Sequence, residues 1–143
     1  MPQSIPSQRI LVIDDEWSVR NTLRLALTFE RNSVELATDA REALQKLAKQ
    51  KFDIVFTDLM MPQMLGYDLV RCIRNKYPYQ VIVMVTAYPD FLGPREKKEN
   101  PVDIIIIKPF SLATITNALE RAYEMSKDRK TTQASLPPPS TPP

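Results

Sequence analysis

The chain has 143 residues with no His, one Cys and two Gly, while 13 residues are Pro and 43% are hydrophobic. The lack of His excludes a Ser-His-Asp triad, a His-ligated zinc or haem and a phosphohistidine carrier, and two distant glycines exclude a Walker loop or a GxGxxG turn. The formal net charge of +2 lies within residues 126–143, which hold three Lys or Arg and one Asp, so the remainder is neutral and gives no sign of direct nucleic acid binding.

The first eight residues, MPQSIPSQ, are polar and contain two Pro, so residues 1–8 are predicted to form a disordered lead. They have neither the charge nor the apolar run of a signal peptide, and no later stretch approaches the roughly 20 apolar residues that span a bilayer. A single Cys without a disulfide partner favours a reducing compartment. We therefore expect a cytoplasmic protein without a membrane partner.

Apolar runs predict five strands, and amphipathic segments predict the helices between them. In chain order these are strand 10–13, helix 16–31, strand 34–37, helix 39–47, strand 54–57, helix 66–77, strand 81–85, strand 104–107 and a last helix from residue 112. Asp39 with Glu42 has the form of a capping box, and Ser111 is placed to cap the last helix. After the fourth strand, Gly93 and Pro94 interrupt the helical pattern, so a fourth helix there is predicted to be short or irregular.

The carboxyl-terminal tail, residues 126–143, is basic at first and then rich in Pro. Its end, TTQASLPPPSTPP (131–143), has almost nothing to bury and is predicted to be extended and solvated. This composition is typical of a linker, and a Pro-rich docking peptide is the alternative. The predicted units are therefore the lead 1–8, one domain over 9–125 and the tail.

Regular alternation of strands and helices predicts an α/β fold, a doubly wound (βα)5 unit with a five-stranded parallel sheet and helices on both faces. In such a sheet, ligands bind beyond the carboxyl ends of the strands. Four of the predicted strands are followed directly by polar residues, namely Asp14 and Asp15, Asp58, Thr86 and Lys108. We expect these side chains to lie together at one edge of the sheet.

Three carboxylates at one edge repel each other and are all ionised only with a cation between them. Oxygen ligands without His or Cys favour Mg²⁺, which needs one or two carboxylates and completes its octahedron with water and phosphate oxygens. Lys108 adds a fixed positive charge and Thr86 a hydroxyl. Together these groups favour phosphoryl transfer onto an aspartate.

Four separate motifs carry a resemblance to a known family. They are ILVIDDE (10–16), FTDLMMP (56–62), VTAY (85–88) and KPF (108–110). In order and spacing they resemble the receiver domain of two-component response regulators, including chemotaxis receivers, over about residues 8–125. The resemblance implies a flavodoxin-like fold with strand order 2-1-3-4-5 and a cis bond between Lys108 and Pro109.

The resemblance also implies how a phosphoryl group is received. Asp58 would be the phosphoacceptor, taking the group from the phosphohistidine of a partner histidine kinase or phosphotransfer protein. Lys108 would bind a phosphoryl oxygen, and the Thr86 hydroxyl would move toward the phosphoryl group as the signal. The chain would then be a signalling switch and no enzyme apart from its own phosphorylation and dephosphorylation.

The metal ligands implied by the resemblance belong to the same edge of the sheet. Asp15 would bind Mg²⁺ directly, and Asp14 would bind it directly or through water. Asp58 and the backbone carbonyl of Met60 would complete the protein ligands.

Two departures from the family pattern concern how the signal leaves the domain. Ile105 stands where receivers usually carry an aromatic residue that turns inward when the threonine moves. The irregular segment 89–101 replaces a regular fourth helix on the face, formed with the fifth strand and the last helix, that usually contacts partners. These departures put the output in question but leave the phosphorylation chemistry intact.

Two other functions compete with the phosphorylated switch. One is a receiver-like binding module whose contacts do not depend on phosphorylation, which Ile105 favours. The other is a magnesium-dependent phosphatase with an aspartyl-phosphate intermediate, which is opposed because Met60 stands where such enzymes need an acid. A downstream protein, an output domain beyond the tail or a second copy of the chain are the candidate output partners.

The resemblance also identifies two residue positions that affect the lifetime of the phosphorylated state. Side chains two residues beyond the phosphoacceptor and two beyond the threonine flank the path of the hydrolytic water in receivers. Here they are Met60 and Tyr88, and neither offers a carboxylate or amide to orient that water. We expect slow self-dephosphorylation.

Overall fold

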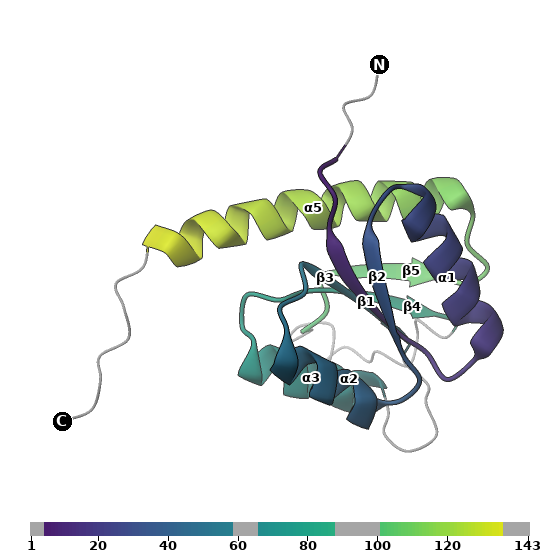
Figure 1. The fold of residues 1–143 in the computed structure, drawn as a ribbon, viewed down its shortest axis with the longest axis horizontal. Coiled ribbons are helices and arrows are strands. Elements are labelled where there is room, and N and C mark those ends of the chain that lie inside the picture. Colours follow the sequence, from purple (N-terminus) through teal and green to yellow (C-terminus); the bar gives the residue numbers. More distant parts are fainter. Residues whose placement is uncertain (1–4, 59–65, 88–100, 136–143) are drawn as a thin grey trace.

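A five-stranded parallel sheet forms the centre of the molecule, with strand order β2-β1-β3-β4-β5. The computed structural model describes residues 5–58, 66–87 and 101–135. The strands are β1 Arg9–Ile13, β2 Ser33–Ala37, β3 Ile54–Asp58, β4 Val81–Thr86 and β5 Ile104–Ile107, and the helices are α1 Trp17–Phe29, α2 Ala40–Lys49, α3 Gly66–Lys76 and α5 Leu112–Ser135. The predicted α/β fold and strand order are confirmed (Figure 1).

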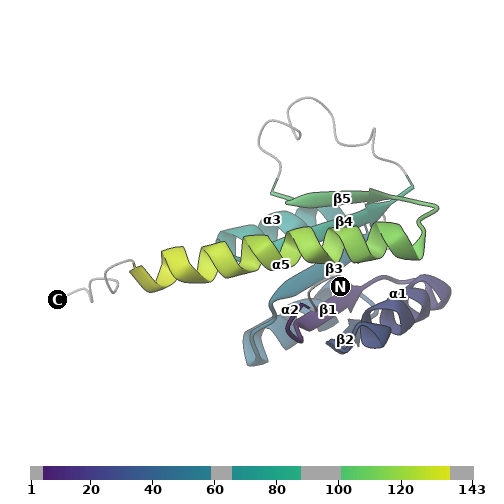
Figure 2. The same ribbon diagram turned by 90° about the horizontal axis from the view of Figure 1, so that it is seen from above.

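The helices cover both faces of the sheet, because alternate strand residues point to opposite sides. Helices α2 and α3 lie on one face and α1 and α5 on the other (Figures 1 and 2). Leu11 and Val55 belong to the apolar cluster beneath α2 and α3. Ile10 and Phe56 belong to the cluster beneath α1 and α5. Two cores thus hold the central strands from both sides, and all of β3 and β4 is buried.

The predicted helix starts are confirmed by hydrogen bonds. The Glu42 N–H donates to Asp39 Oδ1 at 2.8 Å, while Glu42 Oε1 accepts from the N–H of Thr38 at 3.2 Å, one residue before the position that a regular capping box uses. At the start of α5, Ser111 Oγ accepts from the N–H of Thr114 at 3.1 Å. These caps set where α2 and α5 leave the strand ends.

Helix α5 is longer than predicted, and the expectation of an extended segment from residue 131 is wrong for residues 131–135. The helix runs without a break from Leu112 to Ser135, across the predicted boundary between domain and tail. Ser126 is buried, and Arg129 and Lys130 form ion pairs with residues of the sheet end. These contacts stabilise the helix where local composition alone favours a solvated tail. Residues 136–143 lie outside the described part.

The start of the chain also contacts the domain. Residues 5–8 belong to the predicted disordered lead, yet Gln8 is buried and its N–H donates to Asn32 Oδ1 at 2.9 Å. Ile5 packs against the cluster beneath α1 and α5. Residues 1–4 lie outside the described part, as does segment 88–100, which contains nearly all of the predicted irregular fourth helix. None of the helices in the described part combines the length and apolar character needed to cross a membrane.

Candidate functional site

The carboxyl ends of four strands meet at one edge of the sheet and bring together the polar residues that follow the apolar runs. Asp14 directly follows β1, and Asp58 and Thr86 are the last residues of β3 and β4. Lys108 directly follows β5, and its N–H donates to the Thr86 carbonyl at 2.8 Å. The side chains of Asp14, Asp58 and Thr86 are all buried. Parallel register therefore produces the predicted cluster from residues far apart in the chain.

One lysine connects the two buried carboxylates. Lys108 Nζ lies 2.9 Å from Asp58 Oδ2 and 3.8 Å from Asp14 Oδ2. The peptide bond between Lys108 and Pro109 is cis, as the resemblance implies. Burial opposes the charge on Lys108, but the hydrogen bond and negative charge of Asp58 outweigh it and raise the pKa of the lysine. Lys108 is therefore a permanent cation beside the Asp58 carboxylate.

The carboxyl of Asp14 is the least favourable place for a charge in the site. Its side chain is 1% exposed, and burial raises its pKa to about 6. The charges of Asp58 and Asp15 act in the same direction, while the N–H of Glu16 and the charge of Lys108 oppose them. The Glu16 N–H donates to Asp14 Oδ1 at 2.9 Å. A cation between Asp14 and Asp58 would offset this cost.

The other two predicted metal ligands are Asp15 and the backbone carbonyl of Met60. Asp15 is exposed, and Met60 lies outside the described residues. Within the described ranges, no three His, Cys, Asp or Glu side chains are grouped so as to hold a metal ion. Two carboxylates suffice for Mg²⁺, whose other ligands are water and phosphate oxygens. Asp14 and Asp58 offer oxygen ligands, which Mg²⁺ prefers, and a bound cation would stabilise the buried charge of Asp14. These two residues therefore fit a Mg²⁺ site.

Arg20 is a site residue that the sequence analysis missed. It lies on α1, is half-buried, and its Nη1 donates to the backbone carbonyl of Asp14 at 2.7 Å. The sequence places Arg20 near the start of the predicted helix 16–31, six residues after Asp14. The direction of its side chain was not readable from the sequence, since any exposed arginine in that helix would read the same.

The chain matches the family model of the response regulator receiver domain over residues 10–120. It is 38% identical over 104 residues to response regulator MprA of Mycolicibacterium vanbaalenii, a match that covers 73% of this chain and 45% of that protein. It is 33% identical over 121 residues to response regulator MprA of Mycobacterium bovis, covering 85% of this chain and 53% of that protein. The chain thus spans about half the length of these curated relatives.

Solved structures with the same fold include two response regulators. The chemotaxis response regulator CheY4 of Vibrio cholerae superposes with a TM-score of 0.74 at 31% identity, covering 81% of this chain and 98% of that one. The response regulator TrrA of Thermotoga maritima, solved in complex with Mg²⁺ and BeF, gives a TM-score of 0.73 at 28% identity, covering 80% of this chain and 98% of that one.

Proposed function

The chain belongs to the response regulator receiver domain family, and from that premise we propose that Asp58 accepts a phosphoryl group from a partner histidine kinase or histidine phosphotransfer protein in the cytoplasm. Receiver domains are signalling switches, and in this chain the phosphorylated Asp58 would set the state of the switch. The observation that carries it is the 2.9 Å contact between Lys108 Nζ and Asp58 Oδ2, with Asp14 buried beside them.

The transfer would use Asp58 as a nucleophile. A carboxylate oxygen of Asp58 attacks phosphorus while the bond from phosphorus to the partner's imidazole nitrogen breaks, and that nitrogen keeps the electron pair. The ammonium of Lys108 is placed to follow a phosphoryl oxygen, because it already contacts the carboxylate that receives the group. Asp14 and Asp58, with Asp15 and the Met60 carbonyl, would hold Mg²⁺, which when bound neutralises charge on the phosphoryl oxygens.

Thr86 would report the phosphorylated state. It is buried at the end of β4, and its carbonyl accepts from the N–H of Lys108, so its side chain starts next to the residue that binds the phosphoryl group. Rotation of its hydroxyl toward the new anion would be the first movement of the switch. Changed contacts with a downstream protein, an output domain outside this chain or a second copy would follow.

Intact mass after incubation with Mg²⁺ and acetyl phosphate tests this proposal. We expect one acid-stable, base-labile phosphate on the wild-type chain and none on Asp58→Asn. The matched control is Asp128→Asn, since Asp128 is an exposed aspartate on α5, and it should be phosphorylated like wild type. An adduct that persists in Asp58→Asn would contradict the assignment, and continuous release of phosphate from phosphomonoesters would indicate a phosphatase.

A receiver-like binding module is the second candidate, and the side chain of Ile105 favours it. Ile105 is 38% exposed on the edge strand β5 and has no ring to turn inward. A module of this kind would bind its partner equally well with or without phosphate. No mass adduct, and no tightening of Mg²⁺ binding by beryllofluoride, would favour it over the switch.

A further inference from the structure

An open groove of about 380 Å³ lies at the amino ends of the strands, away from the Asp58 edge. Three segments form its walls: residues 47–53, from the end of α2 to the start of β3; residues 76–80, from the end of α3 to the start of β4; and residues 126–133 of α5. The third wall exists only because α5 continues past the predicted end of the domain. The groove is thus a product of the long last helix.

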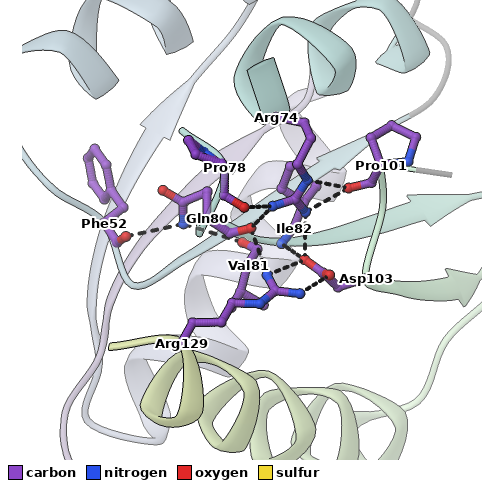
Figure 3. Close-up of polar contacts among 9 residues, drawn as sticks. All are labelled: Phe52, Arg74, Pro78, Gln80, Val81, Ile82, Pro101, Asp103 and Arg129. Carbon is purple, nitrogen blue, oxygen red and sulfur yellow. Dashed lines mark hydrogen bonds and ion pairs between the residues drawn. The ribbon is translucent and has the colours of Figure 1, made fainter. Parts of the chain in front are cut away.

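Ion pairs hold the α5 wall in place, as Figure 3 shows. Arg129 Nη1 donates to Asp103 Oδ2 and to the Gln80 carbonyl, both at 3.0 Å, and Arg129 Nη2 also pairs with Asp103. Arg74 of α3 contacts the same carboxylate at 2.9 Å. Lys130 pairs with Asp53. Arg129 and Lys130 are therefore already paired with Asp103 and Asp53, while Lys51 and Lys76 add positive charge to the lining of the groove.

Aromatic rings and amides make up much of the remaining lining. Phe52, Tyr77 and Tyr79 line the groove, with the amide side chains of Gln50 and Gln133. The Lys76 ammonium lies 5.9 Å from the centre of the Tyr77 ring, and both Tyr77 and Tyr79 are half-buried. Proline-rich segments in the polyproline II conformation bind to aromatic-lined grooves of this kind, where side-chain donors meet their free carbonyls.

We propose that residues 136–143 of the same chain, LPPPSTPP, dock in this groove. The segment begins one residue after α5 ends at Ser135, and Gln133 of that last turn already lines the groove. Eight residues in the polyproline II conformation extend about 25 Å, while returning along α5 from Ser135 to Ser126 takes only about 14 Å. The segment can therefore reach the whole α5 wall after one reversal of the chain.

Tethering and composition favour this occupant over a separate molecule. The segment carries no charged side chain, so its side chains do not compete for the ion pairs of Arg129 and Lys130. Five of its eight residues are Pro, which lowers the conformational entropy lost on binding. Attachment at Ser135 gives an effective concentration on the order of millimolar, so weak contacts suffice. The docking needs no phosphate and is independent of the proposed role of Asp58.

A nitroxide spin label on the tail tests the docking in the full chain. The label is attached to Ser140→Cys in a Cys72→Ser background, because Cys72 is an exposed thiol. We expect loss of the amide signals of Gln50 and Tyr79, which lie on the two walls opposite α5, and their return when the label is reduced. Signal loss confined to residues 131–135 would overturn the proposal.

Matched variants show whether the groove itself is responsible. In the labelled chain, Tyr79→Ala should restore the Gln50 signal, whereas Tyr123→Ala, a tyrosine of α5 that does not line the groove, should not. Replacing Pro137, Pro138 and Pro139 by Ser should restore the same signal without touching the folded domain. If all of these variants keep the signal loss, the proposal is wrong. Loss of signal only when labelled and isotope-enriched chains are mixed would assign the groove to the tail of a second copy, and would also overturn it.

Discussion

Lys108 Nζ lies 2.9 Å from Asp58 Oδ2 and 3.8 Å from Asp14 Oδ2, so one ammonium lies between two carboxylates at the ends of neighbouring strands. The two acids come from β3 and from the residue after β1, and the lysine follows β5. Without a metal, this lysine is the nearest positive charge that both carboxylates share among the described residues. The Lys108 ammonium therefore both offsets the charge of the two buried carboxylates and lies beside the proposed phosphoacceptor.

Removal of this ammonium should disable phosphorylation. In Lys108→Ala we expect the rate of phosphorylation by acetyl phosphate to fall about 100-fold, because a positioned charge on the developing phosphoryl oxygens is lost. The rate of adduct formation by intact mass measures this. Lys127→Ala removes an exposed lysine that contacts Glu124 and the Tyr123 ring on the same helix, and it should phosphorylate at the wild-type rate. Equal rates in the two variants would rule out the role of Lys108.

Asp14→Asn should stabilise the metal-free fold while weakening Mg²⁺ binding. The wild-type carboxyl is 1% exposed and faces the charge of Asp58, so its neutral isostere removes a buried like-charge contact. We expect a gain of about 2 kcal/mol in the free energy of unfolding at pH 7 in the presence of a chelator. Urea denaturation measures it, with the exposed Asp128→Asn as a control that should change little. A loss of stability in Asp14→Asn would show that the attraction between the Asp14 carboxylate and Lys108 outweighs the cost of burying its charge beside Asp58.

Asp103→Asn should destabilise the protein in a pH-dependent way. Burial opposes the charge on Asp103, but the hydrogen bonds from Arg129 and Ile82 and the nearby arginine charges outweigh it and lower its pKa. Because the pKa of Asp103 is lower in the folded than in the unfolded protein, its ionised carboxylate stabilises the fold at pH values above the unfolded-state pKa, and this stabilisation is lost as the pH falls. The difference in free energy of unfolding between wild type and Asp103→Asn should therefore shrink below about pH 4. At pH 7 we expect a loss of about 3 kcal/mol, because two arginines lose their shared partner.

Denaturation curves of wild type and Asp103→Asn at pH 7 and at progressively lower pH measure this difference. If the free energies of unfolding of the two proteins differ by the same amount at every pH, the loss of stability would come from altered packing and the charge of Asp103 would not explain it.

Arg31→Gly should make the protein more stable. Arg31 follows α1 with a φ of 66°, in the left-handed region that costs about 1 kcal/mol for a residue with a Cβ atom. The N–H groups of Arg31 and Asn32 bond back to the carbonyls of Thr28 and Leu27, so the turn itself is required. We expect a gain of about 1 kcal/mol by thermal unfolding. Arg31→Ala removes the same side chain but keeps the Cβ atom, and a similar gain there would contradict the backbone explanation.

Met60→Asn should shorten the lifetime of the phosphorylated chain. The prediction rests on the resemblance, since residue 60 lies outside the described part. An amide two residues after Asp58 would orient the hydrolytic water that the methionine leaves without a partner. The decay of the adduct by intact mass measures the rate, with Met61→Asn as the matched neighbour. Unchanged decay in Met60→Asn would contradict the argument.

Local patterns explain why so much of the fold was readable. The strands contain continuous apolar runs because both faces of a parallel sheet are covered, and such runs stand out in any sequence. Asp58 and Lys108 were recognisable because each directly follows one of these runs. Arg20 was missed because its contact with the Asp14 carbonyl depends on the direction of one side chain.

From the amino-acid sequence alone we could predict the α/β architecture and the polar residues at the strand ends, because these depend on local patterns and their spacing. The strand order followed from the family resemblance. The length of α5 became apparent only in the folded structure. Arg129 and Lys130 belong to a segment that reads as a solvated basic tail, but their partners Asp103 and Asp53 stand 26 and 77 residues earlier in the chain. The raised pKa of Asp14 likewise depends on burial and on charges from other strands. Contacts between residues so far apart in the chain depend on how the elements pack together, and a local sequence pattern does not reveal that packing.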